Sequence, residues 1–213
     1  MLEDLKREVW ECNLMLPKYN LAVMTSGNVS GRDQDSGLVV IKPSGYNYEK
    51  LLPEDMVVVN LDGKVIEGNL RPSLDTNTHL YIYRQRDDIN GIVHTHSIYA
   101  SSFAVAGEPI PACLTSSGML GGGIPVGGYV TIGGEEIGAE IVSKIGMKLA
   151  IIMKNHGVFT IDNDARHATK LAVVVENIAK IAHLAITRSK ITHMSDKQIK
   201  TMIGLYQNKY GQR

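Results

Sequence analysis

The chain has 213 residues, of which 44% are hydrophobic and 21% charged, so it can build a sizeable core and is not a globally disordered polypeptide. Its 22 lysines and arginines balance 22 aspartates and glutamates, which argues against a protein that binds nucleic acid by neutralising phosphates. Two cysteines are too few for a disulfide framework, no apolar run approaches the roughly 18–20 residues of a membrane span, and the charged amino end does not resemble a signal peptide, so we expect a cytoplasmic protein.

Helical and strand patterns alternate along the whole chain. In chain order they predict a helix at 1–16, strands at 22–24, 38–41, 56–59 and 64–67, a helix at 76–86, a strand at 91–94, helices at 98–106 and 135–145, a strand at 149–153, and helices at 165–187 and 195–206. We expect Pro17 to end the first helix and Asp62-Gly63 to form a hairpin turn. This alternation predicts the α/β class in a single domain over residues 1–213.

Two histidines, His94 and His96, come at the end of a predicted buried strand. Side chains two residues apart on a strand point to the same side, so both imidazoles can reach one cation. Neutral imidazole suits Zn²⁺, and three protein ligands with an open fourth position mark a catalytic zinc site. The alternative is a hydrogen-bonded pair of histidines without a metal.

His156 follows a second apolar strand and directly precedes Gly157. Ligands of open α/β sheets gather beyond the carboxyl ends of the strands, so this imidazole can join the other two. The alternative is a histidine that caps a helix or belongs to the core. For the remaining histidines we expect ordinary surface or core positions: His79, His167, His183 and His193.

A carboxylate and three polar turns complete the candidate site. Asp75 can be a fourth ligand or a general base, or it can cap the helix that follows, as can Ser73. Turns with small hydroxyl or amide side chains and free backbone N–H groups bind anions, phosphate above all. Such turns occur at 25–28, 44–45 and 72–73. The glycine run at 121–123 matches neither a Walker loop nor a dinucleotide fingerprint.

The order of these motifs resembles the class II, zinc-dependent sugar-phosphate aldolase and epimerase family, whose domain also occurs in cytoskeletal adducins. The resemblance covers essentially the whole chain and implies a three-layer α/β/α domain with a central mixed sheet. It further implies a cytoplasmic homotetramer with active sites at subunit interfaces. The segments that carry it are Gly27-Asn28-Val29-Ser30, Pro43-Ser44-Gly45, Pro72-Ser73-x-Asp75, His94-Thr95-His96-Ser97, Asn155-His156-Gly157 and Tyr210-Gly211.

The resemblance implies a role for each matching residue. It makes His94, His96 and His156 the ligands of one Zn²⁺ per subunit. It makes Asp75 an acid/base group and Tyr210 a proton donor that reaches the site of a neighbouring subunit. The phosphate-binding positions that it implies are Thr25, Asn28, Ser44, Gly45 and Ser73.

Two branches of the family, L-fuculose-1-phosphate aldolase and L-ribulose-5-phosphate 4-epimerase, match different parts of this sequence. Aldolases usually have Ser-Ser-Glu where this chain has Ser73-Leu74-Asp75, and their tyrosine near Thr115 is missing. The aspartate at 75 and the opening residues look epimerase-like. However, epimerases carry a Thr-His-Ala-Asp-Tyr-Phe segment, whereas residues 114–119 hold no acid, and an insertion before the third histidine that is absent here. The stretch 122–129 and the overall length look aldolase-like.

These features leave two enzymatic hypotheses, both with a phosphorylated ketose as partner and neither with nucleic acid or a membrane. The first is zinc-dependent cleavage of a ketose 1-phosphate, above all L-fuculose 1-phosphate, to dihydroxyacetone phosphate and L-lactaldehyde through a metal-stabilised enediolate. The second is 4-epimerisation of L-ribulose 5-phosphate by the same retro-aldol step and re-addition. A third alternative is an inert binding or scaffold protein of the adducin kind, against which the intact histidine set argues.

Overall fold

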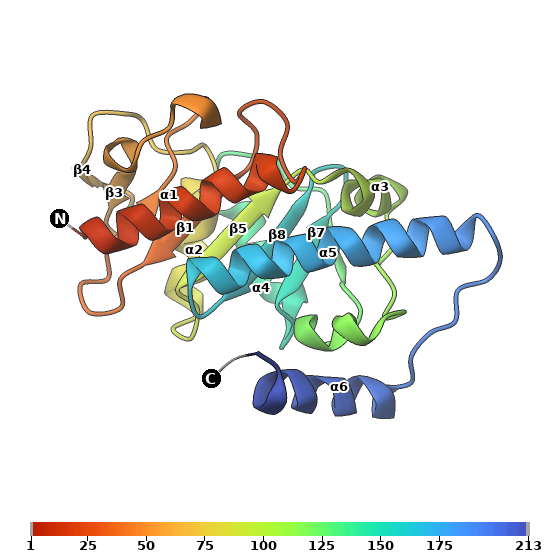
Figure 1. Cartoon of the computed structure of the whole chain (residues 1–213). Helices are drawn as coiled ribbons and strands as arrows, with labels where there is room; N and C mark the ends of the chain where they lie inside the picture. Colours follow the sequence, from red (N-terminus) through yellow and green to blue (C-terminus); the bar gives the residue numbers. More distant parts are fainter. Residues whose placement is uncertain (1, 212–213) are drawn as a thin grey trace.

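The computed structural model describes residues 2–211 and is built around an eight-stranded mixed sheet (Figure 1). The strands lie side by side in the order β4-β3-β2-β1-β5-β8-β7-β6. Neighbouring strands are antiparallel except for β6 and β7, which are parallel. The strands are β1 (Asn28–Arg32), β2 (Val39–Ile41), β3 (Val57–Val59), β4 (Val65–Glu67), β5 (Gly91–Thr95), β6 (Val126–Gly127), β7 (Ala150–Met153) and β8 (Val158–Asp162).

Helices cover both faces of the sheet and make three layers, as predicted. On one face lie α1 (Glu3–Lys18), α5 (Ala165–Ile186) and α3 (Ile98–Ala106), and Figure 1 shows α1 and α5 running across that face. On the other face α2 (Thr76–Gln85) packs with α4 (Glu136–Ile145). The last helix, α6 (Asp196–Lys209), lies against the short 3-10 helix η3 (Thr115–Leu120). None of the helices within the described chain has the length and apolar character to cross a membrane.

Alternation along the strands sends side chains to the two helical layers in turn. In β2, Val40 packs in the core beneath α1, and the neighbouring Val39 packs with α2 and α4. In β1, a Cβ on Gly31 would lie only 2.8 Å from the Leu5 side chain, so glycine lets α1 approach this strand closely. The opposite face of β1 carries polar side chains that meet α2.

The strand Asn28–Arg32 fastens α2 to the sheet. Arg32 donates from its guanidinium to the backbone carbonyls of Tyr83, Asp87 and Ile89, at 2.9, 2.8 and 2.8 Å. The last carbonyls of a helix have no partner inside the helix, so the bond to Tyr83 caps the carboxyl end of α2, and the other two bonds hold the loop that follows it. These bonds fix helix α2 relative to β1, and α2 in turn fixes the position of Asp75 at its amino end.

Several predicted boundaries were wrong. The strand predicted at 22–24 does not form, because Val23 and Met24 are exposed and Met24 enters a turn with a φ of 56°. Strand β1 begins instead at Asn28, the last residue of the turn predicted at 25–28. The first helix continues through Pro17, since the Tyr19 N–H donates to the Met15 carbonyl at 2.9 Å and closes the last turn. Strand β8 was not predicted, and Met1, the predicted start of the first helix, lies outside the described residues.

Candidate active site

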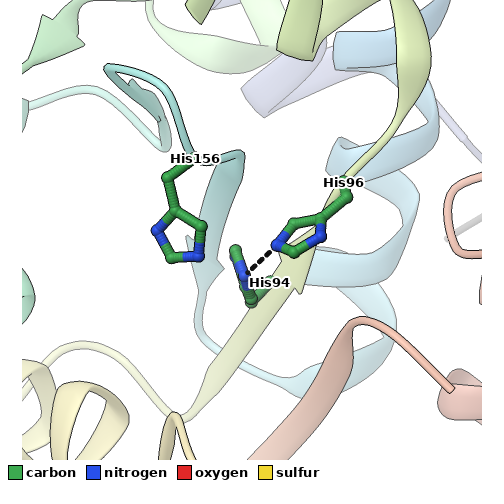
Figure 2. A group of neighbouring side chains, drawn as sticks. All are labelled: His94, His96 and His156. Atoms are coloured by element: carbon green, nitrogen blue, oxygen red, sulfur yellow. Dashed lines mark hydrogen bonds between the residues drawn. The ribbon is translucent and has the colours of Figure 1, made fainter. Parts of the chain in front are cut away.

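Three imidazoles meet at one end of the sheet. His94 is the second-last residue of β5, and His96 follows the strand. His156 lies in the tight turn between β7 and β8. Strands β5 and β7 run in the same direction on either side of antiparallel β8, so their carboxyl ends lie at the same end of the sheet. Figure 2 shows the three side chains gathered there, with His94 between the other two.

The geometry of the three rings suits a single shared ion. The His94 and His96 Nε2 atoms are 3.0 Å apart, and one ring nitrogen from each histidine lies within 4.8 Å of those of the other two. The ring centroids of His156 are 4.7 Å from His94 and 5.2 Å from His96. The sequence prediction that two distant segments bring these imidazoles together is confirmed.

The His94 ring is locked in the orientation that a metal ligand needs. Its Nδ1 lies 2.9 Å from the Val158 carbonyl, which can only accept, so Nδ1 carries the hydrogen and Nε2 keeps its lone pair. The ring also stacks on Phe159, with centroids 4.2 Å apart and an interplanar angle of 17°. A backbone carbonyl and an aromatic neighbour thus aim the Nε2 atom at the site.

Position 157 must be glycine because the neighbouring chain and the His96 ring leave no space for a side chain. A Cβ at this position would lie 2.4 Å from the Thr95 carbonyl oxygen and 2.7 Å from the His96 ring. Asn155, two residues earlier, has a φ of 56°, so the turn uses the left-handed region that few residues adopt. The Asn-His-Gly sequence therefore reflects a tight turn that presents His156 to the other two histidines.

Burial favours the neutral form of the three imidazoles. Desolvation lowers the pKa of His94, His96 and His156 below the ordinary histidine value, and the charge of Asp75 opposes this effect only in part. The His156 Nδ1 atom is also buried without a hydrogen-bond partner in the described part of the chain. Three neutral imidazoles whose ring nitrogens converge in this way fit Zn²⁺ or another divalent cation with a preference for nitrogen ligands.

Asp75 faces the imidazoles from the start of α2. Burial on its own would raise the pKa of Asp75, but the neighbouring His94 and His79 and the hydrogen bond from Asn28 outweigh it, and the pKa stays below its ordinary value. The Asn28 Nδ2 donates to Asp75 Oδ2 at 2.7 Å. The alternative that the Asp75 side chain caps α2 is wrong, because its carboxylate makes no capping hydrogen bond and bonds across to β1 instead.

One cavity of about 190 Å³ unites the predicted positions. We refer to the three turns predicted to bind an anion as one side of the cavity and to the histidines as the other, and Asp75 joins them through its bond to Asn28. Leu74 and Ile132 add two apolar side chains to the wall. The predicted residues in its lining are Thr25, Asn28, Ser44, Gly45, Ser73, Asp75, His94, His96 and His156.

Lys42 also lines this cavity, although the sequence analysis did not select it. Its side chain is 1% exposed, its Nζ donates to the Thr25 carbonyl at 3.2 Å, and it lies 4.7 Å from the centroid of the Tyr48 ring. No carboxylate among residues 2–211 pairs with it, and burial lowers the pKa of Lys42 to about 8. A buried cation without a counter-ion is suited to an anionic ligand. The only signal in the sequence was a lysine directly after an apolar strand.

Tyr210 does not line the cavity of its own chain. Its ring is 58% exposed, stacks edge-on against Tyr206 and lies 5.1 Å from the Lys170 Nζ. Lys170 belongs to the first third of α5, which begins at the end of the sheet opposite the histidines. Within one chain, therefore, Tyr210 is separated from the other predicted catalytic residues.

Comparisons with known proteins agree with this geometry. A family model described as the class II aldolase and adducin N-terminal domain matches residues 7–183. The L-ribulose-5-phosphate 4-epimerase UlaF of Salmonella paratyphi C is 41% identical over 198 residues, which cover 86% of this chain and 86% of that protein. The same enzyme of Salmonella choleraesuis matches equally well.

Solved structures give the same fold. An L-fuculose 1-phosphate aldolase superposes with a TM-score of 0.92 at 30% identity and covers 96% of both chains. The L-fuculose 1-phosphate aldolase of Glaciozyma antarctica, at 21% identity, has a TM-score of 0.81 over 95% of this chain and 81% of that one. The second likeness concerns the fold alone.

Proposed function

The chain belongs to the class II aldolase and adducin N-terminal domain family, and we propose that it is the 4-epimerase of L-ribulose 5-phosphate, with a divalent metal ion as cofactor. The observation that carries this choice is the 41% identity to an L-ribulose-5-phosphate 4-epimerase over most of both chains. The similar fuculose-phosphate aldolase shares 30%. This choice reverses the order of the sequence hypotheses, in which cleavage of a ketose 1-phosphate came first.

We assign the metal to His94, His96 and His156, with one Zn²⁺ per subunit. When bound, such a cation supplies Lewis-acid polarisation of the substrate carbonyl. The three imidazoles carry no negative charge of their own, so they leave the cation's charge available to the substrate. The support for this assignment is the locked His94 ring and the convergence of one ring nitrogen from each of the three histidines.

The opposite side of the cavity holds the phosphate of the substrate. Lys42 provides a cation, Ser44 and Ser73 provide hydroxyl groups, and Thr25 and Gly45 lie in the turns that close around them. Gly45 has a φ of 63°, which allows the backbone to turn tightly at this point. Binding the phosphate at this side orients the sugar carbons toward the histidines.

Asp75 lies between these two sides and moves the proton. Its ionised carboxylate accepts the proton of the C4 hydroxyl as the bond between C3 and C4 breaks. The aldehyde then turns, re-addition to its other face inverts C4, and Tyr210 of a neighbouring subunit returns a proton to the C4 oxygen. The proton taken up by Asp75 is released to solvent and Tyr210 takes one up from solvent, which restores both groups. The separation of Tyr210 from the cavity of its own chain supports its action on a neighbouring subunit. We further propose a cytoplasmic homotetramer, which the resemblance to the family implies.

Cleavage of a ketose 1-phosphate, such as L-fuculose 1-phosphate, is the second candidate. It is favoured by the segment 114–119, which holds no acid where epimerases of the family carry an aspartate. In this reaction the aldehyde leaves, and Asp75 gives its proton to the carbon from which the aldehyde departed. Both reactions share the bond-breaking step and the same residues.

Product analysis separates the two. The purified protein, loaded with Zn²⁺, is incubated with L-ribulose 5-phosphate and, separately, with L-fuculose 1-phosphate. We expect D-xylulose 5-phosphate from the first and little dihydroxyacetone phosphate from the second, with a chelator abolishing turnover. Dihydroxyacetone phosphate as the main product, with L-ribulose 5-phosphate unchanged, would replace the epimerase with the aldolase. Turnover of neither sugar would exclude both.

A further inference from the structure

The candidate metal ligands are held in place in different ways. The His94 ring is fixed by its hydrogen bond to the Val158 carbonyl. The His96 ring has no comparable bond, because within the described chain its one hydrogen-bond contact is the His94 ring, a ligand of the same site. A ligand ring without a second partner is aimed by its backbone alone. The position of His96 therefore depends on the segments on either side of it.

Directly after His96 the chain enters helix α3. Ser97 is the N-cap of this helix, but its hydroxyl makes no capping hydrogen bond. The first N–H groups of a helix have no partner inside the helix and need an acceptor from elsewhere. A carboxylate of α5 supplies it. One oxygen of Glu176 accepts from the Tyr99 N–H and the other from the Ala100 N–H, each at 2.9 Å.

This pair of hydrogen bonds joins the start of α3 to an element that is itself fixed to the sheet. Figure 1 shows α3 beside α5, and α5 packs against β5 and β8. Val175, the residue before Glu176, is completely buried in one cluster with Val158 of β8. A negative charge is also favoured at the start of a helix, where the free N–H groups carry a partial positive charge. Glu176 thus ties the chain directly after His96 to the sheet.

The other end of α3 contacts the turn that carries the third histidine. The Asn155 N–H donates to the Ala104 carbonyl at 3.2 Å, in the last turn of the helix, where carbonyls have no partner inside the helix. Asn155 directly precedes His156. Helix α3 therefore connects two ligand segments, because it begins just after His96 and ends against the residue before His156.

We propose that Glu176 is a positioning residue for the metal site: by holding the start of α3 on α5, it sets the spacing between the imidazoles of His96 and His156. This inference rests on the metal assignment of the proposed function. Without the carboxylate, two N–H groups at the start of α3 lose their acceptors, and the first turn of the helix loosens. His96 then moves with the backbone, since no other bond holds its ring, and three ligands no longer converge.

The affinity of the protein for Zn²⁺ tests this role without any sugar. Glu176→Ala removes both acceptors, whereas Glu176→Gln keeps one oxygen for one of the two N–H groups. The matched control is Asp164→Ala. Asp164 is also a carboxylate that caps a helix, since it accepts from the His167 N–H at 2.7 Å, but it lies at the start of α5, at the end of the sheet opposite the metal ligands.

We expect the dissociation constant for Zn²⁺, measured by competition with a chromophoric chelator, to rise about 10- to 100-fold in Glu176→Ala. Glu176→Gln keeps one of two bonds and should show about half of that effect on a logarithmic scale, about 3- to 10-fold. Asp164→Ala should keep the wild-type constant although its melting temperature falls, because it loses a helix cap elsewhere.

Two results would overturn the proposal. One is wild-type zinc affinity in Glu176→Ala, and the other is an equal loss of affinity in Glu176→Ala and Asp164→Ala, which would reduce Glu176 to a general stabiliser of the fold. If Glu176→Ala does not fold, Glu176→Gln decides, and wild-type affinity in that variant would equally refute the role of Glu176.

The visible spectrum of Co²⁺ bound in place of Zn²⁺ gives a second readout, because its bands depend on how the ligands are arranged. The bands should change in Glu176→Ala and remain those of the wild type in Asp164→Ala, and identical bands in all three proteins would contradict the proposal. A wild type that bound Zn²⁺ but converted neither sugar would refute the proposed reactions alone. A wild type without affinity for Zn²⁺ would refute the metal assignment and the role of Glu176 together.

Discussion

The two sides of the cavity are built in different ways. The histidine side belongs to the sheet. His94 is part of β5, and its ring donates a hydrogen bond to the Val158 carbonyl. The packing around position 157 leaves no room for a side chain there. The opposite side consists of three turns, and its one buried cation, Lys42, is held by backbone carbonyls and an aromatic ring. Strand pairing fixes the residues of the first side, whereas the second side consists of polar residues on turns.

This difference indicates a division of labour. Groups on the sheet are fixed before the substrate arrives, so changes to them should act on metal binding and on kcat. Groups on the turns meet the phosphate, which does not change during the reaction, so changes to them should act mainly on KM. Asp75 lies between the two sides, and Tyr210 lies outside both. Five experiments test this division.

The largest effect is expected on the histidine side. His96→Ala leaves two imidazoles, which hold a divalent ion much less firmly than three, so activity should fall about 10³-fold or more and zinc content should drop. Activity assays and metal analysis of the purified variant measure both. His193→Ala, an exposed histidine outside the cavity, is the control. Unchanged turnover in His96→Ala would contradict the metal assignment.

Asp75→Asn should separate the metal from the chemistry. The amide retains the size of the carboxylate but cannot accept a proton, so kcat should fall about 10²- to 10⁴-fold. Because Asp75 is assigned no metal bond, zinc content should remain that of the wild type. Steady-state kinetics and metal analysis on one preparation test both statements. A variant that lost its zinc would show that Asp75 is a ligand and that the two sides overlap.

Lys42→Met should act on the turns alone. Methionine retains the apolar stem but removes the charge, so KM for the phosphorylated sugar should rise about 10- to 100-fold while kcat changes little. Lys64→Met, at an exposed lysine beyond the cavity, is the matched control. A kcat effect larger than the KM effect would break the division between the two sides.

The pH dependence of KM sharpens the same test. Burial lowers the pKa of Lys42 to about 8, so the empty enzyme carries this charge below pH 8 and loses it above. In the wild type KM should therefore rise as the pH increases through about 8, and this rise should be absent in Lys42→Met. A rise of the same size in both proteins would assign it to another group.

The smallest effect is expected from Tyr210. Its ring is exposed and packs against Tyr206, so Tyr210→Phe should leave the melting temperature unchanged and lower kcat about tenfold through loss of one proton donor. Deletion from residue 210 onward should do the same. Tyr19→Phe serves as a control for a surface hydroxyl. Full activity in both Tyr210 variants would reduce this tyrosine to a packing residue.

Much of the site was predictable because its signals are local. Two histidines two residues apart on a strand share a side whatever surrounds them, and a glycine after His156 points to a tight turn. The helix at 98–106 was also predicted with its observed bounds. Strand β8 was not predicted, although it pairs locally with β7 across the Asn-His-Gly turn. Its pairing with β5, which brings the Val158 carbonyl to His94, joins residues more than 60 positions apart and has no local signal.

The spacing of residue types along the sequence was thus enough to predict the α/β class, the histidine set and the polar turns. The tertiary structure decided what those groups can do. It buried Lys42 without a counter-ion, turned Asp75 from a possible helix cap into a partner of Asn28, and brought Glu176 to the start of α3. The physical reason is that desolvation and hydrogen-bond partners depend on which distant segments pack together, and that information lies in the whole sequence and not in any one stretch of it.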